Sequence, residues 1–225
     1  MNNYKWNQYN NNKKLIENLI VFNKKKKFNA VEKGLYNQIR DIFCLSLILS
    51  LKTSKKKKIK VLDFGSNSLA YSNIINKIDC KKYSFNVYDP FYNNEKFPLP
   101  FKVSYFKDPT LLKKNSWDMV NFGSSIQYLK NLNTLKNINF TKTNLVSITH
   151  TPINLKRSYS EMQTNHKSLK QNIYSLSKIK KIFYEKKFKL IFKSRNDDNL
   201  SVAKNKKDTY LLNLVFSKWK IISLT

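Results

Sequence analysis

The sequence has little glycine, arginine, histidine or cysteine. Its 225 residues include three glycines, three arginines, two histidines and two cysteines. Two cysteines, Cys44 and Cys80, are too few for a disulfide framework or for a metal site built on cysteine. We therefore expect no structural disulfides and no metal, and the reducing cytoplasm is the default location.

Long apolar runs are also missing. Residues 1–12 are polar and rich in asparagine, without the apolar core of a signal peptide. The longest apolar run, Ile42–Leu51, contains two serines and falls short of the roughly 20 apolar residues that a membrane span needs. We predict no transmembrane segment, and favour a helix packed against a sheet. The alternative is contact with an anionic membrane surface through Lys24–Lys27 and Lys55–Lys58.

The net charge of +29 suggests nucleic acid at first sight, but the composition argues against it. The chain has 40 lysines, 30 asparagines and three arginines (Arg40, Arg157 and Arg195). Lysine and asparagine are encoded by A/T-rich codons, so coding bias explains the charge. A surface selected for phosphate uses arginine more freely, because its planar fork makes two bonds to phosphate. We predict no specific nucleic-acid partner, only weak affinity for polyanions.

The length fits one globular domain with a sizeable core and a helical extension. Residues 1–58 form the predicted N-terminal helical extension, and residues 59–225 the predicted α/β domain. The expected strands are 59–64, 84–88, 101–106, 117–122, 145–149, 188–193 and 210–216. The expected helices are 13–22, 29–51, 69–78, a helix through Leu129, and 177–187, with an irregular stretch after residue 150. This alternation predicts a mostly parallel sheet with helices on both faces. The last two strands lack a helix between them, which predicts an antiparallel pair at one edge.

Two positions in this pattern suit a nucleotide-like ligand. The stretch Ile59–Ser68 reads as a strand, a tight turn at Gly65 and the start of a helix, which together offer backbone N–H groups. Asp63 ends the strand, where a carboxylate can reach an amino group or a water. Asp89 follows Gly65 by 24 residues, the separation at which an acid binds both ribose hydroxyls. The alternative for Asp89 is a turn aspartate before a proline.

The same stretch resembles the first motif of class I S-adenosylmethionine-dependent methyltransferases. Gly65 stands at the first glycine of that motif, while Asn67 and Leu69 replace the second and third; asparagine tolerates a left-handed backbone better than most residues. A second segment, Trp117–Leu129, resembles the D-V-V-L-x-S-S-S-L-Q-Y-L segment of one class I methyltransferase family of bacteria. That family is often encoded near surface-polysaccharide genes.

Three further features are similar to that family. Tyr71 matches its aromatic residue after the first motif, Thr149–Ile153 resembles its D-R-T-P segment with His150 in place of the arginine, and Gln163 matches a later glutamine. The resemblance spans roughly Val61–Phe216. It implies a Rossmann-like methyltransferase sheet with an antiparallel last strand, and S-adenosylmethionine as the cofactor.

The residues that the resemblance and the strand ends single out fall into three groups. We expect cofactor contacts from Asp63, Gly65, Ser66, Asn67, Asp89, Gly123 and Ser124, and acceptor contacts from Gln127, Tyr128 and Gln163. His150 is the candidate base because it follows the fifth strand, at the edge where α/β sheets bind ligands. Alternatively His150 positions the substrate or bonds the backbone, and Gln127 and Tyr128 pack at a helix start. The acceptor is expected between His150 and the polar stretch 158–171, which also contains His166.

Three functions remain open. The first is a methyltransferase acting on a small molecule or a glycan precursor. The second is a degenerate, non-catalytic methyltransferase-like subunit, which the missing glycines permit. The third is an RNA methyltransferase, although Asn121–Ser124 stands where a base-methylating enzyme carries Asn/Asp-Pro-Pro-Tyr/Phe. Nothing in the sequence indicates an oligomeric state.

Overall fold

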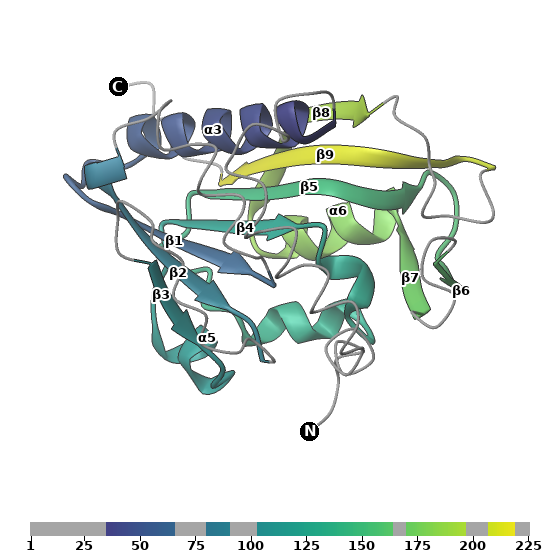
Figure 1. Cartoon of the computed structure of the whole chain (residues 1–225), viewed down its shortest axis with the longest axis horizontal. Helices are drawn as coiled ribbons and strands as arrows, with labels where there is room; N and C mark the ends of the chain where they lie inside the picture. The colour runs from purple at the N-terminus through teal and green to yellow at the C-terminus, as the bar shows by residue number, and fades with distance from the viewer. Residues whose placement is uncertain (1–34, 66–79, 91–102, 164–169, 197–206, 219–225) are drawn as a thin grey trace, which may run out of the picture.

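A nine-stranded sheet runs through the centre of the molecule (Figure 1). The computed structural model describes residues 35–65, 80–90, 103–163, 170–196 and 207–218. Several expected features lie outside these residues: the helices 13–22 and 69–78, and the side chains of Ser66, Asn67, Tyr71 and His166.

Five strands form the parallel part of the sheet, in the order β3-β2-β1-β4-β5. Their bounds are Ile59–Phe64 for β1, Tyr83–Tyr88 for β2, Val103–Phe106 for β3, Met119–Gly123 for β4 and Leu145–Asn154 for β5. Every neighbouring pair in this series is parallel. The predicted parallel sheet is confirmed, and all its carboxyl ends lie along one edge.

The last two strands complete the other side. β8 (Phe188–Asn196) and β9 (Thr209–Lys218) pair antiparallel, and β9 also pairs antiparallel with β5, so β9 lies between β5 and β8. The predicted antiparallel pair at one edge is therefore confirmed.

Helices cover both faces, as predicted. On one face, α3 (Leu35–Thr53) buries Phe43 and Leu47 in a cluster with Val61 of β1. On the other, α6 (Leu176–Glu185) buries Phe183 among side chains that include Leu62. Consecutive residues of β1 thus face opposite layers, which is the two-residue period of a strand. No helix in the described ranges is long and apolar enough to cross a membrane.

The stretch after residue 150, expected to be irregular, contains regular strands in its described residues. β5 continues to Asn154, and β6 (Tyr159–Met162) and β7 (Lys170–Ser175) form an antiparallel hairpin. β7 also pairs with the end of β5. The sequence expectation failed because these short strands are rich in polar residues, and it is their contacts with the rest of the fold that order them.

The helix predicted through Leu129 is also wrong. The chain instead makes one turn of 3₁₀ helix, η2 (Ile126–Tyr128). The Leu129 carbonyl accepts hydrogen bonds from Asn172 and Tyr174 of the hairpin, so it is engaged outside any helix. The remaining short helices, not predicted, are η1 (Cys80–Lys82), α5 (Thr110–Lys114) and η3 (Leu132–Asn137).

Candidate functional site

The ends of β1 and β2 bring Gly65 and Asp89 to neighbouring positions. Gly65 has a φ of 69°, a left-handed conformation that glycine adopts without cost. Its N–H donates to the Tyr88 carbonyl at 2.8 Å, one residue before Asp89. The Asp89 N–H in turn donates to the Phe106 carbonyl at 3.2 Å, and the residue is half-buried. The tight turn and the acid therefore lie at neighbouring strand ends on the carboxyl edge of the sheet.

Asp63 belongs to a buried row of hydrogen-bonded side chains. Its Oδ1 accepts from Asn121 Nδ2 at 2.9 Å, and Asn121 Oδ1 accepts from Ser147 Oγ at 2.6 Å. Asp63 and Ser147 are 0% exposed and Asn121 2%. The three lie opposite one another on β1, β4 and β5, on the face covered by α3. Burying a carboxylate is costly unless it is hydrogen-bonded, so Asn121 holds Asp63 in place at the strand end.

The turn after β4 places further polar atoms at this edge. Ser124 has a φ of 53°, which is uncommon for serine, and its N–H donates to the Thr149 carbonyl at 2.9 Å. Ser124 Oγ accepts from Gln127 Nε2 at 2.9 Å. The hydroxyl of Ser125 and Oε1 of Gln127 are buried, yet neither makes a hydrogen bond within the described part of the chain. An unsatisfied buried polar atom costs about 1–3 kcal/mol, so these two atoms suit a ligand that bonds them.

Gly123, by contrast, is not demanded by the fold. A Cβ added to it would lie 3.5 Å from Asn121 Nδ2 and 3.8 Å from Thr149 Oγ1, which are ordinary contacts. Its φ is not positive. A small side chain at this position would therefore fit against Asn121 and Thr149.

The three predicted acceptor residues lie in or beside the β6–β7 hairpin and the neighbouring turn η2. Gln163 Nε2 donates to the Tyr128 hydroxyl at 2.6 Å and to Gln171 Oε1 at 3.3 Å. Gln163 is 3% exposed, Gln171 0% and Tyr128 8%. Gln127 lies beside Tyr128 in η2. The structure therefore joins Tyr128 to Gln163, with Gln127 next to Tyr128 in the chain and bonded to Ser124, and it adds Gln171, which the sequence did not single out.

His150 sits at an irregularity of β5. The register between β5 and β9 shifts between Ile148 and Thr151, and His150 has a φ of 48°. Its N–H donates to Asn213 Oδ1 at 2.8 Å, and the residue is half-buried. The bulge lies one residue beyond Thr149, which pairs with Gly123. His150 is thus near the turn after β4, while its role as a base stays a prediction.

Comparison with solved structures identifies the architecture. The chain aligns with the magnesium protoporphyrin IX methyltransferase of Synechocystis PCC 6803, with bound SAM, at a TM-score of 0.55 and 10% identity, over 92% of this chain and 93% of that one. A plantazolicin methyltransferase in complex with a triazolic desmethyl analogue and SAH gives a TM-score of 0.53 and 10% identity, over 96% and 95%. This is the class I methyltransferase fold.

A third methyltransferase of known structure also aligns with this chain. It is the 1,6-didemethyltoxoflavin-N1-methyltransferase of Burkholderia thailandensis, with bound 1,6-didemethyltoxoflavin and S-adenosylhomocysteine, at a TM-score of 0.51 and 11% identity, over 92% of this chain and 88% of that one. No protein-family model matches the sequence, and no curated protein matches it either. The likeness is one of fold.

The candidate site also contains residues that sequence reasoning missed. Asn121, Ser147 and Ser125 were not predicted as site residues, although Asn121 and Ser125 lie within the segment that carried the resemblance. A polar residue inside an otherwise apolar strand is the signal that was available for Asn121 and Ser147, since such residues need a partner when buried.

Proposed function

We propose that this protein is an S-adenosylmethionine-dependent methyltransferase acting on a small molecule, and more specifically on a glycan precursor. The observation that carries the proposal is the convergence of polar groups at one strand edge: the left-handed Gly65 turn, Asp63, Asp89, and the unsatisfied buried atoms of Ser125 and Gln127. The class I fold supports it, and the resemblance to a family encoded near polysaccharide genes supports the acceptor. The cytoplasm would be its location.

These residues fit the cofactor by their chemistry. Asp89, half-buried at the end of β2, would accept from the ribose hydroxyls, and Asp63 would face the amino group. Ser125 Oγ and Gln127 Oε1 would satisfy their hydrogen-bonding capacity against the bound molecule. The cofactor supplies an electrophilic methyl group on a sulfonium; the protein supplies position, water exclusion and, where the acceptor is a hydroxyl, a base.

Cofactor binding tests the proposal directly. Calorimetry should show S-adenosylmethionine binding to the folded protein, and Asp89→Ala should weaken it about ten- to a hundredfold, because a hydrogen bond to a charged group is worth about 1.5–3 kcal/mol. Asp108→Ala is the matched control, since Asp108 follows β3 but is exposed, and its carboxylate accepts hydrogen bonds from the N–H and hydroxyl of Thr110. A folded protein that binds no cofactor at millimolar concentration would support the non-catalytic alternative instead.

His150 is proposed as the base. If so, His150→Ala should lower turnover about 10²–10⁴-fold with little change in cofactor affinity. If His150 only positions the acceptor, the Michaelis constant should rise while turnover holds. The two results separate the roles that the bulge in β5 allows.

A further inference from the structure

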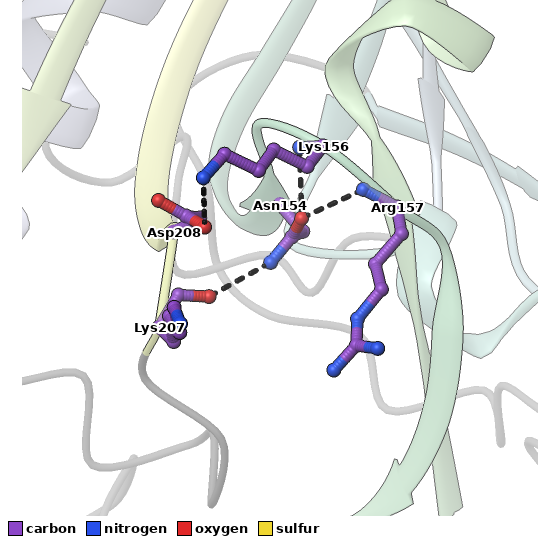
Figure 2. Close-up of a pocket in the computed structure, with 5 residues that line it drawn as sticks. All are labelled: Asn154, Lys156, Arg157, Lys207 and Asp208. Atoms are coloured by element: carbon purple, nitrogen blue, oxygen red, sulfur yellow. Dashed lines mark hydrogen bonds and ion pairs between the residues drawn. The ribbon is translucent and has the colours of Figure 1, made fainter.

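A cavity lies at the carboxyl end of β5, which extends five residues beyond Thr149 on the same side of the sheet as the strand ends that carry Asp63 and Asp89. Its volume is about 290 Å³. Its lining consists of Asn154, Lys156, Arg157, Lys207 and Asp208 (Figure 2). The cavity thus forms between the end of β5 and the start of β9.

Asn154 builds this cavity. Its Oδ1 accepts the backbone N–H groups of Lys156 and Arg157, each at 2.8 Å, and its Nδ2 donates to the Lys207 carbonyl at 3.0 Å and to Thr209 Oγ1 at 2.8 Å. The residue is 2% exposed. One buried side chain therefore fixes both walls, and its own donors and acceptors are occupied in doing so.

The cavity is positively charged. It has three cationic side chains against one carboxylate, and that carboxylate, Asp208, pairs with Lys156 at 3.0 Å. Figure 2 shows Lys156 reaching toward Asp208, while the Arg157 side chain extends away from that pair. Within the described ranges, no hydrogen bond or ion pair engages the Arg157 guanidinium. The guanidinium of Arg157 is therefore the group that a ligand can bind.

Arginine at this place is informative because the chain uses it so rarely. With 40 lysines supplying surface charge, solubility does not require an arginine here. The guanidinium differs from an ammonium in presenting a planar fork that matches the two oxygens of a carboxylate or phosphate. Arg157 lies two residues before β6, and Gln163, directly after β6, contacts Tyr128, so β6 links the cavity to the predicted acceptor residues.

We propose that this cavity is a binding site for an oxyanion group, a carboxylate or a phosphate, with Arg157 as its principal contact. Two sources of the group are conceivable: the methyl acceptor itself, which rests on the proposed function, or a free anion. The four residue steps from His150 to Asn154 span roughly 13 Å of strand. An acceptor that uses both places would be extended, with its acidic group remote from the methylated atom.

The test uses the scarcity of arginine. In a ¹⁵N-labelled protein, three side-chain Nε–H signals are expected, one for each arginine, and Arg157→Ala identifies its own by loss. Titration with inorganic phosphate at constant ionic strength should shift the Arg157 signal saturably. Calorimetry should show binding weakened at least about tenfold in Arg157→Ala and less in Arg157→Lys, which keeps the charge but loses the fork.

Arg195→Ala is the matched control. Arg195 lies over the Tyr210 ring, 4.0 Å from its centroid, and is not part of the cavity lining. Its loss should leave phosphate binding unchanged. Binding that falls equally in both variants would mean a general charge effect and would overturn the site, as would an Arg157 signal that shows no saturable shift at tens of millimolar phosphate.

Organic probes separate the two sources. Glucose 6-phosphate and glucuronate, with glucose as the neutral control, are titrated with and without S-adenosylhomocysteine. If either acidic sugar binds more tightly than inorganic phosphate, the site belongs to a group carried on an organic acceptor. If inorganic phosphate binds more tightly than both sugars, the site belongs to a free anion. Because these titrations do not require methyl transfer, a failure of cofactor binding would sink the proposed function and leave the oxyanion site standing.

Discussion

The two faces of the sheet differ in what they bury. Toward α6 the core is aromatic: Phe122, Phe183 and Phe216 pack within one cluster, with ring centroids 4.8 Å apart for the last two. Toward α3 the core is apolar near the start of the strands but carries the row Asp63–Asn121–Ser147 further along. Burying an aromatic side chain contributes several kcal/mol of stability, whereas a buried hydrogen bond adds only about 0.5–1.5 kcal/mol net. The contrast indicates that one face mainly stabilises the fold and the other prepares the site.

The largest effect should come from the aromatic face. Phe183→Ala should lower the free energy of unfolding by about 3–5 kcal/mol, because it removes a buried ring and leaves a cavity. Urea denaturation measures it, and Tyr184→Ala, 73% exposed on the same helix, should change stability by no more than about 0.5 kcal/mol. The folded Phe183→Ala protein should bind the cofactor with the affinity of the wild type. A weaker affinity would contradict the assignment of the site to the other face of the sheet.

Substituting Asn121 in the row Asp63–Asn121–Ser147 should destabilise the protein less than Phe183→Ala does, and should also weaken cofactor binding. Asn121→Leu removes a donor to Asp63 and the acceptor of Ser147, so unfolding free energy should fall by about 2–4 kcal/mol and cofactor affinity about tenfold. Ser147→Ala keeps the bond between Asn121 and Asp63, and should preserve affinity. Equal binding by wild type and Asn121→Leu would show that Asp63 needs no such support.

The smallest effect concerns a polar group on the aromatic face. Burial raises the pKa of Tyr174 to about 12, from an ordinary 10.0, and its hydroxyl donates to the Leu129 carbonyl at 2.8 Å. The unfolded chain therefore loses this proton first as the pH rises. Its contribution to stability is complete below pH 10 and is lost between pH 10 and about 12, by at most about 2 kcal/mol given partial solvent screening.

Tyr174→Phe isolates that contribution. The variant should be less stable near neutral pH by about 1 kcal/mol, the value of one hydrogen bond, and should lose less stability than wild type over the alkaline range. Urea denaturation midpoints of the wild type and of Tyr174→Phe, measured from pH 9 upward in steps of about one pH unit, test this expectation. Parallel profiles would mean that Tyr174 is not protected in the folded state.

Much of the architecture was predictable, and the reason is local. Runs such as Ile59–Phe64 are short and largely apolar, and seven of the nine strands follow from runs of that kind. The site was predictable where it depends on chain position: Gly65 and Asp89 end consecutive strands, and parallel strands end at one edge. The hairpin of β6 and β7 was not predictable from the sequence, because polar strands carry a weak signal of hydrophobic periodicity.

The sequence by itself determined the parallel sheet, its antiparallel last strand and the edge at which the site lies, because hydrophobic periodicity and a few turn residues specify these. Only the tertiary structure decided which polar side chains meet. Asn121 reaches Asp63 across 58 positions, and Asn154 joins Arg157 to Lys207 across the start of β9. Such contacts depend on strand register and on the direction of single side chains, and neither is set by local sequence preference.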